Sequence, residues 1–283
     1  MFKLANFLTG FNLICGILSI IMAFSGRIEL AFLFIILGAL FDFSDGLVAR
    51  ALKQQGELGK QLDSLADVVT FGVAPGLIVF VLFILFGATD IIIESGGRPE
   101  EVWMPGTFGY NINYWINVYL NDLLGNQSGL YPNHFFGWYL VLPFVSLFIP
   151  FMSLFRLAKF NIDTRQSDNF IGLPTPANAI FFGSFALLIW DGFGEDNWKA
   201  TLSFILIQEQ ILMTLVVLFS FLLIAEIPLL SLKFKSFSFE ANKARYLILI
   251  VSGVMLLFFQ FWAIPLIILS YLLISILQNL FSN

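Results

Sequence analysis

Four aspartates between residues 42 and 67 are the side chains whose type and spacing point most directly to chemistry. Asp42 and Asp45 are three residues apart, and Asp63 and Asp67 are four apart, so each pair lies on one face of a helix. They flank the junction of two long apolar segments, where ionised groups are costly and indicate function by default. Carboxylates this close cannot neutralise one another. The pattern therefore predicts a bound cation, and most simply a pair of divalent metal ions.

Small residues follow the first pair of acids on the same helix face. Gly46 and Ala49 continue the stripe that begins at Asp42, and their lack of bulk lets a large ligand approach the helix closely. Arg50 is adjacent and suits a neighbouring anion. Divalent ions held by carboxylates are what phosphate-ester chemistry uses to neutralise charge and to orient the displacement. These residues therefore predict a reaction at a phosphate ester.

The elements that must position these acids are membrane helices. Of the 283 residues, 59% are hydrophobic and only 12% are charged, and 35 are Phe, which predicts an integral membrane protein. A membrane-spanning backbone must satisfy its own hydrogen bonds, so we expect an all-α, polytopic bundle that forms a single domain over residues 1–283. Eight apolar runs are long enough to cross a bilayer: 7–25, 28–50, 64–87, 137–158, 176–190, 208–230, 245–261 and 263–281.

The positions of Lys and Arg predict the orientation of this bundle. With a cytoplasmic amino terminus, three of the 14 basic residues fall outside (Arg27, Arg98 and Lys199). The others fall on the cytoplasmic side, namely Lys3, Arg50, Lys53, Lys60, Arg156, Lys159, Arg165, Lys233, Lys235, Lys243 and Arg245. All six Trp then lie on the outer side, as an interfacial belt would. The acids therefore face the cytoplasm, residues 231–244 form a cytoplasmic loop, and residues 88–136 form an extracytoplasmic insertion.

Cysteine and histidine are too scarce for a thiolate or imidazole metal site. Cys15 is the only cysteine and His134 the only histidine, which argues against zinc or haem and favours oxygen-ligated Mg²⁺ or Mn²⁺. His134 falls in the insertion, whose first part, 94–101, reads as a loop. Its middle part, 110–124, is a candidate for lying along the membrane surface. Asn126 begins a glycosylation triplet of a kind that is common by chance.

The two acidic segments resemble the signature of a known family. The pattern D-x-x-D-G-x-x-A-R over residues 42–50, a gap of eight residues and G-x-x-x-D-x-x-x-D over residues 59–67 is similar to that of the CDP-alcohol phosphotransferases, membrane enzymes of phospholipid synthesis. The resemblance implies a six-helix core, a CDP-linked lipid donor and two metal ions held by Asp42, Asp45, Asp63 and Asp67. It also implies Asp67 as general base, CMP as leaving group, and a nucleotide site at Asp45, Gly46, Ala49, Arg50 and Gly59.

Further stretches are similar to the phosphatidylserine synthase branch of this family. They are Asn6–Asn12, Glu57–Gly76, Phe155–Asn161 and Gly172–Asn178. The resemblance implies transfer of the phosphatidyl group of CDP-diacylglycerol to the hydroxyl of L-serine, giving phosphatidylserine and CMP. As surroundings and partners we expect membrane lipid, a bacterial cytoplasmic membrane and a homodimer, with no nucleic acid.

Residues outside the signature leave two interpretations open. Asn6, Thr9 and Asn12 recur at helical spacing and either cap and join helices or contact the donor phosphate. Arg156 and Lys159 share a helix end. They either anchor it by reaching to the membrane interface or form an anion subsite for the lipid phosphate or the acceptor's carboxylate.

Three rival interpretations compete with serine transfer. The same chemistry could use glycerol phosphate, inositol phosphate or another small alcohol as acceptor. The acids could instead belong to a cation transporter, but they fall at the ends of spans on one side, and a transporter gives no reason for Gly46 and Ala49. They could also pair with Arg50, Lys53 and Lys60 in a solvated loop, which their helical spacing disfavours.

Overall fold

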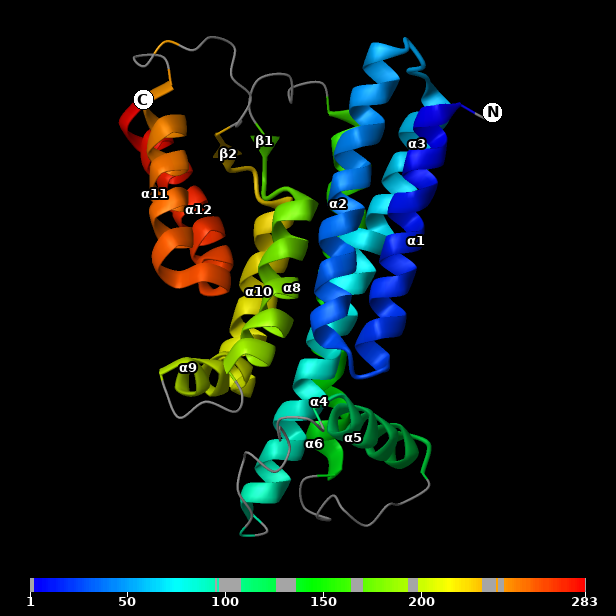
Figure 1. The fold of residues 1–283 in the computed structure, drawn as a ribbon, viewed down its shortest axis with the longest axis vertical. Coiled ribbons are helices and arrows are strands. Elements are labelled where there is room, and N and C mark those ends of the chain that lie inside the picture. The colour runs from blue at the N-terminus through cyan, green and yellow to red at the C-terminus, as the bar shows by residue number, and fades with distance from the viewer. Residues whose placement is uncertain are drawn as a thin grey trace.

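The computed structural model of the chain is a bundle of helices with one short pair of strands (Figure 1). It describes residues 3–94, 96, 108–125, 136–163, 170–192, 198–230, 238 and 242–282. The amino-terminal half contains α1 (Leu4–Phe24), α2 (Ile28–Ala51), α3 (Glu57–Asp67), the π-helix η1 (Val68–Val73), α4 (Ala74–Glu94) and α5 (Phe108–Leu123). The predicted sequon at Asn126 and the side chain of His134 lie outside the described residues.

The carboxyl-terminal half completes the bundle. It contains α6 (Phe136–Val141), the 3₁₀-helix η3 (Leu142–Leu147), α7 (Phe148–Ile162), β1 (Phe170–Ile171), α8 (Thr175–Gly192), α9 (Trp198–Ile207) and α10 (Glu209–Ile224). β2 (Pro228–Leu229), α11 (Lys243–Phe259), the 3₁₀-helix η5 (Gln260–Trp262) and α12 (Ala263–Ser282) follow. α11 and α12 form a hairpin at one side of the molecule (Figure 1).

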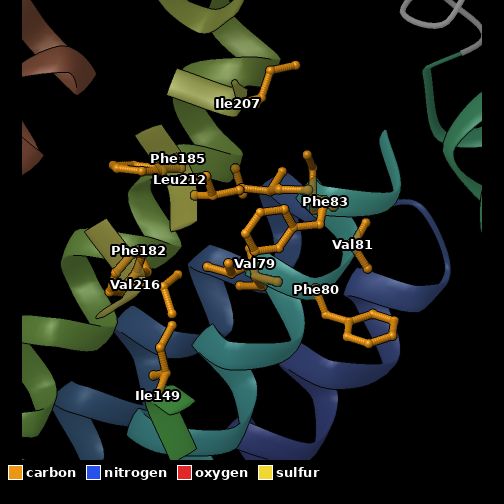
Figure 2. Packing of buried hydrophobic residues seen from close by; sticks show 14 of the residues in the cluster. Val79, Phe80, Val81, Phe83, Ile149, Phe182, Phe185, Ile207, Leu212 and Val216 are labelled. Carbon is orange, nitrogen blue, oxygen red and sulfur yellow. The ribbon is translucent and has the colours of Figure 1, made fainter. Parts of the chain in front are cut away.

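A single long helix passes through the centre of the bundle. α3, η1 and α4 continue one another over 38 residues, Glu57–Glu94, about 57 Å at 1.5 Å per residue and therefore longer than a bilayer core of about 30 Å. Side chains of α4, among them Val79 and Phe83, pack with those of α8 and α10, such as Phe182 and Val216 (Figure 2). The predicted run 64–87 thus marked only the middle of this helix.

All eight predicted apolar runs fall on helices, and the chain is an integral membrane protein. Five helical stretches are long and apolar enough to span a membrane, or six if the bent pair α9–α10 is one span. One of the five, Lys243–Leu280, is the α11–α12 hairpin and therefore contains two of the predicted runs. α8, with 18 residues, is not among the five.

The carboxyl-terminal boundary of the predicted run 208–230 was wrong. A further helix, α9, precedes the run, and the chain bends by 64° between α9 and α10. α10 ends at Ile224, and Ala225 takes an extended conformation. Pro228 has no N–H to donate to the carbonyl of Ile224, so the helix cannot continue through it. Pro228 and Leu229 then pair antiparallel with Ile171 and Phe170. This two-residue ladder holds the segment before α8 against the end of α10.

The two ends of the bundle carry different elements. α3, the end of α2 and the strands lie at one end, and α5, α6 and α9 lie at the other (Figure 1). The second end carries Trp115, Trp138 and Trp198. Arg98, Trp103, Arg165, Lys233 and Lys235 lie outside the described residues. Which compartment each end faces stays a prediction.

The described part of the 88–136 insertion is a helix packed on protein. α5 contacts α4 and α6, and its Ile112 and Tyr119 are fully buried. Burial raises the pKa of Tyr119 to about 12, so its hydroxyl stays protonated and donates to the carbonyl oxygen of Leu140 at 2.8 Å. Because its inner face is covered by protein, α5 is part of the fold as well as a candidate for the membrane surface.

Candidate active site at the carboxylate cluster

A short turn brings the two acidic helix segments together. The chain reverses between α2 and α3, where Lys53 adopts a left-handed conformation with φ of 53°. Gln54 donates its backbone N–H to the carbonyl of Ala49 at 2.8 Å, and Lys3 donates its Nζ to the carbonyl of Gln54 at 3.0 Å. The turn is thereby tied to both α1 and α2, and α2 and α3 run antiparallel with their acids facing each other.

Three of the four predicted aspartates converge on one point. Asp42, Asp63 and Asp67 each offer one carboxylate oxygen, and these oxygens all lie within 4.8 Å of one another. Asp45 is outside this triad and accepts a hydrogen bond from Oγ1 of Thr9 at 2.5 Å. Asp45 and Asp67 are each 7% exposed. Helical spacing therefore predicted the cluster, but not the separation of Asp45 from the other three.

The cluster fits a divalent cation better than it fits basic side chains. None of the ion pairs found among the described residues involves these aspartates, and Lys60 instead donates its Nζ to the carbonyl of Asn161 at 2.5 Å. The Oδ1 atom of Asp63 is buried without a hydrogen-bond partner, which is costly unless a ligand binds it. A buried carboxylate oxygen without a hydrogen-bond donor, beside two further carboxylates, suits an oxygen-ligated ion such as Mg²⁺ or Mn²⁺.

An adjacent cavity collects the residues predicted to bind the donor. It has a volume of about 370 Å³, within the range of small-molecule sites. A Cβ added at Gly46 would meet only the Arg50 guanidinium, at 4.0 Å, so that helix face is open. The predicted residues that line the cavity are Asn6, Thr9, Asp45, Gly46, Ala49, Arg50, Gly59 and Asp63.

Asn12 and Thr70 hold Asp67 in place. Asn12, predicted either to join helices or to contact the donor phosphate, donates its Nδ2 to Oδ1 of Asp67 at 3.0 Å. Thr70, for which the sequence predicts no role, donates its Oγ1 to the carbonyl of Asn12 at 2.9 Å. Thr70 lies in the π-helix Val68–Val73, so its position relative to Asp67 does not follow from α-helical spacing.

Close helix packing around Thr70 depends on two glycines. A Cβ added at Gly16 of α1 would lie 2.5 Å from Oγ1 of Thr70, and one added at Gly38 of α2 would lie 2.5 Å from its Cγ2. Both positions must therefore lack a side chain for η1 to approach α1 and α2 this closely. Since η1 directly follows Asp67, this contact fixes the position of the Asp67 carboxylate along the bundle relative to α1 and α2.

Arg156 and Lys159 do not share one site. Arg156 is 6% exposed, donates its Nε to the carbonyl of Leu173 at 3.0 Å and interacts electrostatically with Asp67. Lys159 forms an ion pair with Glu226 at 2.8 Å and is partly exposed. The structure therefore brings Arg156 towards the carboxylates, whereas Lys159 joins α7 to the segment after α10.

The comparison with known families agrees with this geometry. Residues 2–94 match the family model of the CDP-alcohol phosphatidyltransferases, and this segment contains the four aspartates, the cavity and Asn12. Over this segment the chain is similar to the CDP-alcohol phosphatidyltransferases. In this structure the matched segment corresponds to α1, α2 and the long helix α3–η1–α4, and the family generally uses a divalent metal.

Several curated relatives of the chain have names that include serine. The chain is 46% identical over 69 residues to a CDP-diacylglycerol–serine O-phosphatidyltransferase of Bacillus subtilis, covering 24% of this chain and 39% of that protein. It is 28% identical over 215 residues to an archaetidylserine synthase of Methanothermobacter thermautotrophicus, covering 74% and 66%. A Helicobacter pylori serine O-phosphatidyltransferase is 29% identical over 182 residues, covering 64% and 55%. The matches thus span between about two fifths and two thirds of these relatives.

Proposed function

We propose that this protein transfers the phosphatidyl group of CDP-diacylglycerol to the hydroxyl of L-serine, giving phosphatidylserine and CMP. The observation that carries the proposal is the convergence of Asp42, Asp63 and Asp67 beside a cavity in the segment that is similar to the CDP-alcohol phosphatidyltransferases. The serine acceptor is supported by the relatives, whose names specify serine O-phosphatidyl transfer or archaetidylserine synthesis.

The four aspartates suit the handling of a pyrophosphate. Two divalent ions, Mg²⁺ or Mn²⁺, held by Asp42, Asp45, Asp63 and Asp67 would supply charge neutralisation and orientation of the phosphates. The nucleotide end of the donor would occupy the cavity beside Gly46 and Ala49, with Asn6, Thr9, Arg50 and Gly59 at its walls. CDP-diacylglycerol is thereby bound at its polar end while its acyl chains stay in the membrane.

Asp67 is the proposed general base. Asn12 donates to Oδ1 of Asp67 and leaves Oδ2 to accept the proton of the seryl hydroxyl. The seryl oxygen forms a bond to the phosphorus of the phosphatidyl group, the bond from that phosphorus to the bridging oxygen breaks, and CMP leaves with the electron pair. The carboxyl proton then passes to solvent, which restores the base.

We propose Arg156 as the anchor of the acceptor's carboxylate. It is a buried cation that interacts with Asp67, and a guanidinium can bind a carboxylate through two parallel hydrogen bonds. Lys159 was predicted for the same subsite, and it forms an ion pair with Glu226, just beyond the end of α10. The proposed acceptor subsite therefore rests on Arg156.

We further propose a homodimer in a bacterial cytoplasmic membrane, with the active site facing the cytoplasm. The orientation is supported by the excess of basic residues at the end of the bundle that carries the acids. Several of the curated relatives are bacterial. A cation transporter is disfavoured because the cavity beside the acids is lined by residues of the turn between α2 and α3, and that turn lies at one end of the bundle (Figure 1).

The deciding experiment is an acceptor panel with purified protein. CDP-diacylglycerol and Mn²⁺ or Mg²⁺ would be supplied with L-serine, ethanolamine, glycerol phosphate or inositol phosphate, and CMP and the lipid product would be measured. We expect rapid CMP release with L-serine and little with the others. Equal rates with glycerol phosphate would reject the serine assignment while keeping the chemistry, and no CMP release with any acceptor would reject both.

A further inference from the structure

One helical turn deeper than the carboxylates, the bundle buries polar groups that lack partners. Asn178, in the first turns of α8, is fully buried, and neither its Nδ2 nor its Oδ1 has a hydrogen-bond partner. Asn12 has a second buried atom, Oδ1, without a partner. A buried amide with no hydrogen bond costs roughly 1–3 kcal/mol per group, so two at one level call for an explanation.

The packing of α8 on α2 shows how far along the bundle Asn178 lies from the carboxylates. A Cβ added at Gly183 would lie 2.8 Å from a ring carbon of Phe32 and 3.2 Å from Cδ1 of Ile35, and α2 and α8 run antiparallel (Figure 1). At 1.5 Å per residue, Asn178 lies about 7.5 Å above this contact, and Asp42 lies about 10–15 Å above it. Asn178 is therefore about one turn deeper than the carboxylates.

Asn12 reaches the same level from the other side. A Cβ added at Gly38 would lie 3.1 Å from Oδ1 of Asn12, and Gly38 precedes Asp42 by four residues, which is about one helical turn. Since Nδ2 of Asn12 is bound to Asp67, its free oxygen lies directly beneath that carboxylate. α8 also contacts η1, the segment that follows Asp67.

A buried cation, Arg156, is tied to the segment that leads into α8. Arg156 uses its Nε for the carbonyl of Leu173, two residues before α8 begins, and no other hydrogen bond or ion pair of its guanidinium is found within the described part of the chain. Burying an unpaired charge costs several kcal/mol. The guanidinium of Arg156 lies over the ring of Phe160, 5.2 Å from the centroid, and interacts with Asp67. Among the described residues, its remaining N–H groups have no hydrogen-bond acceptor, just as the amide oxygens of Asn12 and Asn178 have no donor.

The guanidinium of Arg156 and the amide of Asn178 suit the carboxylate and the ammonium of an amino acid whose hydroxyl points to Asp67. We propose that Arg156 and Asn178 bind the amino-acid end of the acceptor beneath the carboxylates, with Arg156 on the carboxylate and Oδ1 of Asn178 on the ammonium. This inference rests on the proposed function and adds a specificity-determining residue, Asn178, from a segment outside the family match at residues 2–94. The acceptor thereby lies on the opposite side of Asp67 from the nucleotide cavity.

The test compares Asn178→Ala with Ser184→Ala, a control in the same helix. Ser184 is fully buried but donates its Oγ to the carbonyl of Phe181 at 2.7 Å, so it offers no free group to a ligand. We expect Asn178→Ala to raise the KM for L-serine about ten- to a hundredfold, as loss of a hydrogen bond to a charged group does. Affinity for CMP should stay within about twofold of the wild type.

Two truncated acceptors separate the two contacts. 3-Hydroxypropanoate lacks the ammonium, so its inhibition constant should be the same in Asn178→Ala and in the wild type. Ethanolamine lacks the carboxylate, so its inhibition constant should be unchanged by Arg156→Ala. Asn178→Ser serves if the alanine variant fails to fold, because it keeps a polar group at the position.

Several outcomes would overturn the inference. A serine KM that stays within twofold of the Ser184→Ala control would assign Asn178 to an internal water. A parallel loss of CMP affinity would assign it to the donor site. Failure of the proposed function is distinguishable, because the wild type would then release CMP with another acceptor and not with L-serine.

Discussion

Gly16 and Gly38 face different atoms of Thr70, so a side chain added at each glycine should have a different effect. A Cβ at Gly38 would lie 2.5 Å from Cγ2 of Thr70, whereas a Cβ at Gly16 would lie 2.5 Å from its Oγ1 and 2.9 Å from its Cα. Thr70 is fully buried, so neither contact is relieved by a small movement. Overpacking of this kind costs about 1–3 kcal/mol, which is the expected loss of unfolding free energy for Gly38→Ala and for Gly16→Ala.

A second substitution should rescue one variant and not the other. Thr70→Ser removes Cγ2 but keeps the hydroxyl that donates to the carbonyl of Asn12. Gly38→Ala combined with Thr70→Ser should therefore recover most of the lost stability. Gly16→Ala combined with Thr70→Ser should not, because its contacts are with Oγ1 and the backbone. The rate of CMP release should likewise recover in the Gly38→Ala, Thr70→Ser variant and not in the Gly16→Ala, Thr70→Ser variant, since η1 fixes the position of Asp67.

The assay is a double-mutant cycle measured by unfolding in a detergent titration and by CMP release. A coupling energy above about 0.5 kcal/mol is expected between residues 38 and 70, and a value near zero between residues 16 and 70. Equal rescue of both glycine variants, or additivity in both cycles, would refute the packing described for η1.

Three further substitutions test the site. Asp67→Asn should reduce turnover about 10²–10⁴-fold, as loss of a general base does, while Asp42→Asn should mainly weaken Mn²⁺-dependent CMP binding; a fully active Asp67→Asn protein would contradict the base assignment. Gly46→Leu should abolish CMP binding by filling the open helix face, measured by titration calorimetry, and normal binding would contradict the cavity assignment. Lys159→Ala should leave the serine KM unchanged, because its partner is Glu226, and a raised KM would return Lys159 to the acceptor subsite.

The parts of the site that could be predicted from the sequence depend on local helical spacing. Asp42, Asp45, Asp63 and Asp67 lie within one helical hairpin, so their intervals alone placed them on facing surfaces. Even there, the sequence could not separate Asp45 from the triad, because Thr9 of α1 binds it and the register of α1 against α2 is not encoded in either spacing. Local periodicity thus predicted that the four aspartates lie near one another, but not which three of them converge.

The contributions of Thr70 and Asn178 could not be predicted for a related reason. The π-helix Val68–Val73 interrupts the α-helical period directly after Asp67, and Pro75 supplies a physical cause, since it has no N–H to donate to the carbonyl of Phe71. A phase calculated at 3.6 residues per turn is therefore wrong beyond residue 68. Asn178 is more than a hundred residues away in the chain, so only the packing of α8 on α2 gives its depth.

The two proposals together divide the site at Asp67. The cavity lies towards the turn between α2 and α3, with Asp45 and Gly46 at its wall. Asn178 lies about one helical turn beneath the carboxylates, and Arg156 is buried and tied to the segment that leads into α8. Because the two groups of residues contact different substrates, their substitutions should separate kinetically: changes on the cavity side should alter CMP affinity, and changes beneath should alter the serine KM. Asp67, the proposed general base, lies between the two groups in this proposal, so its substitution should reduce kcat while changing either affinity less.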